Sequence, residues 1–201
     1  MKSNTFMDAV RNRRSYYRLS SGSPVADEEI IHLLEEVVTN VPSAFNSQSA
    51  RLVLLLGDRH RKMWDITLDV LRKVTPEKSF ARTKEKVEGS FASGHGTVLF
   101  YEDMDVIEDM QKKFPVYADS FRAYSDHTSA MHQFVVWTSL EEMGFGASLQ
   151  HYNPLIDKEL AEMLDINPKW RLVAQMPFGI PEDTPGEKEI YPLDRRLFIF
   201  R

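Results

Sequence analysis

Residues 125–157 read SDHTSAMHQFVVWTSLEEMGFGASLQHYNPLID, and the rest of the chain can be understood around them. The first part predicts a helix over residues 125–143. Its apolar positions lie nearly all round the circumference: Met131, Phe134, Val135, Trp137, Thr138 and Leu140. A helix with this pattern is buried, so we expect it to be the central helix of the domain. Gly144 and Gly146 would end it, because glycine adopts the left-handed conformation common at helix C-termini without a Cβ clash.

A segment of small and then polar or aromatic residues follows the glycines and ends at Pro154. Its members are Ala147, Ser148, Leu149, Gln150, His151, Tyr152 and Asn153. Such a segment suits a backbone that lies close to a flat ligand. An ordinary helix, turn and strand would show the same spacing, and this alternative stays open.

Composition predicts one soluble globular domain over residues 1–201, with 42% hydrophobic and 27% charged residues. The net charge of −5 does not favour a nucleic-acid partner. The chain has no cysteine, so any electron-transfer chemistry would need a bound cofactor. No apolar run has membrane-spanning length and the N-terminus lacks a signal-peptide pattern, so we expect no membrane partner and a cytoplasmic location.

Arg13, Arg14 and Ser15 form a candidate anion site near the N-terminus. Arginine carries forked donors that match phosphate oxygens, and serine adds a hydroxyl. Four arginines within residues 11–18 also fit an ordinary solvated surface, which is the more common meaning of such a run. Arg18 is separated from the serine by two tyrosines, and we assign it no role.

Residues 42–49, PSAFNSQS, form a polar loop between a predicted helix and a predicted strand. Loops of this kind are common and need no ligand. Asn46 and Gln48, however, carry side-chain amides that both donate and accept hydrogen bonds. In an extended loop, amides two residues apart would suit a ring edge on which donors and acceptors alternate.

The segments between these motifs show both helical and strand patterns. Apolar runs predict strands over residues 51–56, 97–101 and 170–178. Amphipathic or capped segments predict helices over residues 27–41, 58–74, 77–91, 103–113 and 155–164. The terminal run 197–200 also reads as a strand, which would be an exposed apolar edge unless another strand paired with it.

These motifs together resemble the nitroreductase family, and within it the fatty-acid-repression-mutant-like and copper-induced members. The resemblance spans nearly the whole chain and is most specific in the run from Ser129 to Asp157. The Arg-Arg-Ser element and the Pro-Ser-x-x-Asn-x-Gln loop occur in the family's order. Ser49 and Ala50 stand where many relatives have Pro-Trp.

The resemblance implies an α+β fold, with a mostly antiparallel central sheet flanked by helices in an intertwined homodimer. It also implies FMN as the cofactor, with its phosphate near the arginines and its ring near the polar loop. Arg196 is a better match than Arg195 for a further phosphate contact. The implied cofactor-binding residues are Arg13, Arg14, Ser15, Pro42, Ser43, Asn46, Gln48, Leu149, Gln150, His151, Tyr152 and Arg196.

The implied activity is reduction of nitroaromatic or quinone-like compounds by NADH or NADPH, by ping-pong hydride transfer through flavin N5. It requires no catalytic acid–base side chain. In the family one subunit supplies the arginine motif, its partner supplies part of the polar loop, and the C-terminal segment crosses to the partner. An alternative is a flavin-binding regulatory protein of lipid or stress signalling with little turnover.

Other catalytic and metal patterns are weak. His127 and His132 lie five residues apart, which does not place both on one side of a helix, so no metal site is predicted. Ser129 with His132 and Asp126 lacks the glycine-framed turn of a nucleophilic serine. No GxGxxG or P-loop pattern is present, which argues against a Rossmann domain or an NTPase.

Overall fold

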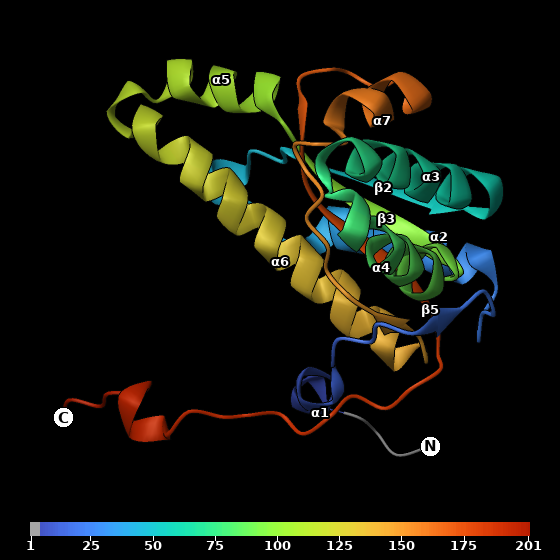
Figure 1. Ribbon diagram of the computed structural model, residues 1–201. Coiled ribbons are helices and arrows are strands. Elements are labelled where there is room, and N and C mark those ends of the chain that lie inside the picture. Colours follow the sequence, from blue (N-terminus) through green and yellow to red (C-terminus); the bar gives the residue numbers. More distant parts are fainter. Residues whose placement is uncertain (1–4) are drawn as a thin grey trace.

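The computed structural model describes residues 5–201, which form a five-stranded antiparallel sheet with helices on both faces (Figure 1). The strands are β1 (Leu19–Ser20), β2 (Ala50–Leu56), β3 (Gly96–Asp103), β4 (Gly146–Ala147) and β5 (Trp170–Pro181). The α-helices are α1 (Phe6–Asn12), α2 (Asp27–Asn40), α3 (Gly57–Val74), α4 (Glu77–Val87), α5 (Met104–Lys113), α6 (Phe121–Glu142) and α7 (Asp157–Leu164). The order β1–β5–β3–β2, with β4 also paired to β5, confirms the predicted α+β class.

Both faces of the sheet are buried, because alternate side chains of a strand point to opposite faces. On β3, Val98 and Phe100 pack in one core with residues of α2 and α6. Leu99 and Tyr101 pack in a second core with residues of α3 and α7. This explains why β3 reads as a continuous apolar run in the sequence.

Several element boundaries differ from the sequence predictions. The central helix α6 begins at Phe121, because this buried ring extends the helix toward the N-terminus. The helix predicted over residues 77–91 ends at Val87 and continues as a π-helical turn, Glu88–Ala92. After α6 the strand is only Gly146–Ala147, followed by one bridge between Gln150 and Gln175.

The central helix is not buried all round within one chain. Val136 and Leu140 are fully buried, whereas Met131 and Phe134 are 39% and 37% exposed. The prediction that α6 is buried all round is therefore wrong for a single chain. Its exposed apolar side chains lie where no other element of residues 5–201 covers them.

After β5 the C-terminal segment runs past α1 and then leaves the body of the molecule (Figure 1). It contains a short 3₁₀ turn, Leu193–Arg195, and residues 197–200 form no strand within this chain. A strand needs a neighbour for its backbone hydrogen bonds, and here the segment lies away from the sheet. Phe200 is 94% exposed. The described residues contain no helix with the length and apolar character needed to span a membrane.

Candidate functional site

The arginine element lies directly after the short helix α1. The Thr5 side chain accepts a hydrogen bond from the Asp8 amide, and Asp8 bonds back to the Thr5 amide, so a capping box fixes the start of α1. The helix ends at Asn12, and the next residues turn toward the C-terminal part of α6. The arginine motif is therefore positioned by contacts with α6.

Two contacts with α6 hold the arginine pair. The Arg13 guanidinium lies 4.3 Å from the centre of the Trp137 ring, a cation–π contact. The Arg14 amide donates a hydrogen bond of 2.8 Å to the Glu141 carboxylate. Burial raises the pKa of Glu141, while the Arg14 amide and the two arginine charges oppose that rise.

A hollow of about 500 Å³ lies beside these residues. Arg13, Arg14 and Ser15 line one side of it, and residues 183–188 line the other. The Arg14 guanidinium donates to the Gly186 carbonyl, which ties the chain after β5 to this side of the molecule. Guanidinium and hydroxyl donors on one wall are the chemistry that holds a phosphate or a polyol.

The segment after α6 lies side by side with the arginine element. Ser15 forms a parallel bridge with Ala147, and the Tyr16 amide donates to the Ala147 carbonyl at 3.0 Å. A Cβ on Gly146 would lie 2.9 Å from the Tyr16 Cβ, so this position needs a glycine for close approach. Gly144, with φ +94°, ends the helix as predicted, whereas Gly146 belongs to β4.

Residues 149–152 run along β5 with alternating hydrogen bonds. Gln150 exchanges backbone hydrogen bonds of 2.7 and 2.9 Å with Gln175. Successive N–H groups of an extended chain point in opposite directions, so the amides of Leu149 and His151 face away from β5. Within residues 5–201 these two amides have no backbone acceptor, which leaves them available to a ligand.

Tyr152 is bonded and packed within the chain. Its amide donates to the Gln175 side-chain oxygen at 2.8 Å. Its ring makes edge contacts with Trp64 and Phe91, with centroids 5.8 and 6.4 Å away, and burial raises the pKa of its phenol. Its predicted contact with a cofactor stays a prediction.

The polar loop of residues 43–48 is not extended, and this part of the sequence prediction is wrong. Phe45, Asn46 and Gln48 all have positive φ, between 50° and 55°. The Ser43 hydroxyl accepts from the Gln48 amide at 2.9 Å and closes the loop. Each non-glycine residue in this conformation costs about 1–2 kcal/mol, which surrounding contacts must offset.

An aromatic cluster supplies those contacts. The Phe45 ring packs against Phe114, Phe121 and Tyr124, with centroid distances of 4.9, 5.4 and 6.5 Å. The cluster belongs to the N-terminal end of α6 and the segment before it. Within residues 5–201 the side-chain amides of Asn46 and Gln48 make no hydrogen bond, and both residues are exposed.

The two predicted parts of the site are far apart within one chain. The arginine element contacts Trp137, and the polar loop contacts Tyr124, thirteen residues earlier on the same helix. At 1.5 Å per residue this is about 20 Å along α6. Arg196 directly follows the 3₁₀ turn Leu193–Arg195. This turn lies in the C-terminal segment, which extends past α1 and away from the body of the molecule (Figure 1).

Sequence reasoning missed a buried polar pair at the end of the polar loop. The Ser49 hydroxyl donates to the Glu102 carboxyl at 2.6 Å, and both residues are fully buried. Burial raises the pKa of Glu102 to about 7, and its second oxygen has no hydrogen-bond partner among the described residues. The sequence showed only a carboxylate near the end of an apolar strand.

A second pair anchors the same end of the loop. Arg51 donates to the Gln48 carbonyl at 2.8 Å and to the Asp103 carboxylate at 2.9 Å. The Asp103 amide in turn donates to the Ser49 carbonyl. The loop is therefore fixed to β3 by two neighbouring acidic residues.

The nitroreductase family model matches residues 10–180 of this chain. The chain belongs to the nitroreductase family. Saccharomyces cerevisiae HBN1 is 34% identical to this nitroreductase-family chain over 196 residues, covering 96% of the chain and 97% of HBN1. The nitroreductase FRM2 of the same yeast is 32% identical, covering 91% of each chain.

A bacterial structure is similar over the same length. Nitroreductase CinD from Lactococcus lactis, solved with chloramphenicol and with 4-nitrophenol, is 36% identical with a TM-score of 0.89. The match covers 98% of this chain and 100% of CinD. The nitroreductase fold predicted from the sequence is confirmed.

Proposed function

We propose that this nitroreductase-family chain is an FMN-dependent enzyme that reduces nitroaromatic or quinone-like compounds with NADH or NADPH. The observation that carries the proposal is the position of the Arg13–Arg14–Ser15 element directly beside Ala147, where the segment of residues 147–151 begins. One segment offers phosphate-binding donors, and the other offers free backbone amides. The binding of nitro compounds by CinD supports the acceptor class.

The residues present fit FMN. Arg13 and Arg14 would hold its phosphate, with the Ser15 hydroxyl on the polyol chain. The amides of Leu149 and His151 would lie along the ring, and Asn46 and Gln48 have unbonded amides for its polar edge. FMN, when bound, supplies the centre that accepts a hydride from the nicotinamide and passes it to the acceptor.

The chain's own residues would position the ring. The backbone of Gln150 and the amide of Tyr152 are hydrogen-bonded to Gln175 of β5, which holds this segment in place. Pre-arranged polar groups of this kind favour charge that develops on a bound ligand without further rearrangement. The proposed reaction requires no general acid or base from the chain.

A second copy of the chain would complete each site. The polar loop lies about 20 Å along α6 from the arginine element of its own chain. An apolar groove of about 620 Å³ between α2 and α6 includes the exposed Met131 and Phe134. The partner's α-helical face would cover this groove, and the apolar residues of the C-terminal segment would cross to the partner. The proposed active unit is a homodimer with two shared sites.

The test is an absorbance spectrum followed by turnover. The purified protein should be yellow, release FMN on denaturation, and oxidise NADH or NADPH when 4-nitrophenol is present. A protein that binds FMN but shows negligible turnover with nitro and quinone acceptors would support the regulatory alternative. A colourless protein that takes up no added FMN would contradict both.

A further inference from the structure

A second hollow, of about 650 Å³, lies on the molecule apart from the one that Arg13 lines. Three cationic residues line it: Arg18 from the N-terminal segment, and Arg82 and Lys86 from α4. Thr83 and Ser90 add hydroxyl groups. This volume is within the range of about 300–1,000 Å³ that small-molecule sites occupy.

The cations of this basic hollow have no acidic partner. Within residues 5–201, no salt bridge includes Arg18, Arg82 or Lys86, whereas the adjacent Lys84 lies 3.6 Å from Glu88 on the same helix. The Lys86 ammonium lies 5.7 Å from the centre of the Phe91 ring. Glu85 is the one carboxylate in the lining. The hollow therefore carries a net positive charge on a chain whose net charge is −5.

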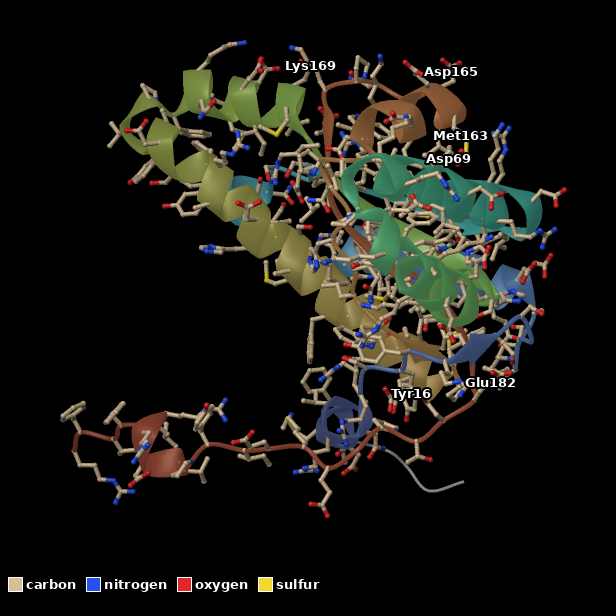
Figure 2. All side chains as sticks on the ribbon, in the orientation of Figure 1. Tyr16, Asp69, Met163, Asp165, Lys169 and Glu182 are labelled. Carbon is tan, nitrogen blue, oxygen red and sulfur yellow. The ribbon has the colours of Figure 1, made fainter. Side chains whose placement is uncertain are left out.

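The basic hollow adjoins both segments of the candidate cofactor site. Arg18 follows Ser15 by three residues, and its carbonyl accepts from the Glu182 amide at 2.9 Å. Figure 2 shows the labelled Tyr16 and Glu182 on these neighbouring segments. On the other side the connection runs through the core: the buried Phe91 follows Ser90 of the lining and packs against the Tyr152 ring.

We propose that Arg18, Arg82 and Lys86 bind the phosphate groups of the nicotinamide nucleotide that reduces the enzyme. This proposal rests on the proposed function, and it places the phosphate groups of one substrate, the nicotinamide nucleotide, in the basic hollow. A dinucleotide is an anion that the acidic chain repels on average, so a local group of unpaired cations raises its concentration at the site. Arginine forks and a lysine point charge are the usual phosphate ligands in proteins.

The experiment uses the FMN-loaded enzyme and separates its two half-reactions. Stopped-flow spectroscopy measures flavin reduction against NADPH and NADH concentration for wild type, Arg82→Gln, Lys86→Gln and the double variant. Lys84→Gln is the matched control, because it removes one charge from the same helix outside the hollow. In a separate arm, dithionite-reduced enzyme is reoxidised by 4-nitrophenol.

We expect each single variant to weaken the apparent nucleotide affinity roughly five- to tenfold with the limiting reduction rate unchanged, since a charge-assisted contact is lost. Lys84→Gln and the reoxidation rates should match wild type. A loss with both nucleotides places the pyrophosphate in the hollow, and a loss with NADPH alone places the 2′-phosphate there. Unchanged affinity in the double variant, or an equal loss in Lys84→Gln, would overturn the proposal.

Two further readouts separate this proposal from the proposed function. A fall in FMN content in Arg82→Gln or Lys86→Gln would assign these residues to the flavin and overturn the nucleotide site. Calorimetric titration of NADP⁺ into wild type and the double variant measures binding without turnover. Binding that the double variant loses would uphold a nucleotide site in the hollow even if no acceptor were reduced. Failure of wild type to bind FMN would contradict the proposed function, and with it the role of the nucleotide as reductant.

Discussion

The two ends of α6 present the two parts of the proposed cofactor site in different ways. At the C-terminal end, the arginine element is held by a cation–π contact with Trp137 and a hydrogen bond to Glu141. At the N-terminal end, the polar loop is held in left-handed conformations by the packing of Phe45. The arginine element is thus held by ordinary contacts, whereas the backbone of the polar loop is locally strained.

This difference shows how one helix can serve two sites. The parts are too far apart to meet within one chain, yet each is fixed in place, one by Trp137 and Glu141 and the other by the packing of Phe45. Strained backbone persists only where surrounding contacts over-determine it, and such places are often functional. We therefore interpret each end of α6 as half of a site that a second chain completes.

Removing the C-terminal segment should have the largest effect. Deletion of the residues after Asp194 removes the exposed apolar run that we expect to cross to the partner. Light scattering should show loss of the dimer, and the flavin absorbance should fall with it, because both sites are shared. A truncated protein that is monomeric yet keeps full FMN and full NAD(P)H oxidation would contradict the shared-site proposal.

The second largest effect is expected for a single substitution in the arginine element, which contacts the C-terminal part of α6. Arg13→Ala should weaken FMN binding by roughly tenfold to a hundredfold, since a charge-assisted phosphate contact is worth about 1.5–3 kcal/mol. Arg18→Ala should change FMN affinity little, because Arg18 lines the other hollow. Fluorescence titration of the apoprotein with FMN measures both, and equal affinities would show that the phosphate lies elsewhere.

The buried Glu102 makes the N-terminal end of α6 sensitive to pH. Its pKa is raised to about 7 by burial, so its contribution to stability is present in acid and is lost as pH rises through 7. Glu102→Gln removes this titration. Between pH 5 and 8 the wild type should lose about 2–3 kcal/mol of unfolding free energy relative to Glu102→Gln.

Urea unfolding of the two proteins at both pH values measures this difference. Ser49, Arg51, Asp126 and Arg171 are the polar and charged neighbours that act on Glu102, and they are unchanged in the comparison. Parallel pH dependence in the two proteins would show that the Glu102 carboxyl does not titrate in this range. The Ser49 hydrogen bond alone would then account for its role.

Much of the fold follows from periodicity and local chemistry. The apolar runs of β2, β3 and β5 and the amphipathic patterns of α2 and α3 gave elements within a few residues of their observed bounds. The arginine element was found because its residue types match phosphate. Its position beside Ala147 is a contact between distant parts of the chain that no sequence pattern predicted.

The rest depends on contacts between distant parts of the chain. The left-handed loop arises because Phe45 packs on Phe114 and Phe121, which lie far along the sequence. The basic hollow joins Arg18 to α4, whose lysines and arginines read as an ordinary exposed face. The sequence did not predict that Met131 and Phe134 on α6 are exposed. A wide apolar pattern does not show whether the same chain or a partner chain covers the helix.

Subunit complementation tests the shared site most directly. Differently tagged chains carrying either Arg13→Ala or the pair Asn46→Ala and Gln48→Ala are coexpressed, and the mixed dimer is isolated through both tags. If each site joins the arginines of one chain to the loop of the other, one site carries all three substitutions and the other carries none. We predict that the mixed dimer binds one FMN tightly and has about half the wild-type turnover, while both parent homodimers bind weakly. A mixed dimer as weak as its parents would contradict the shared site.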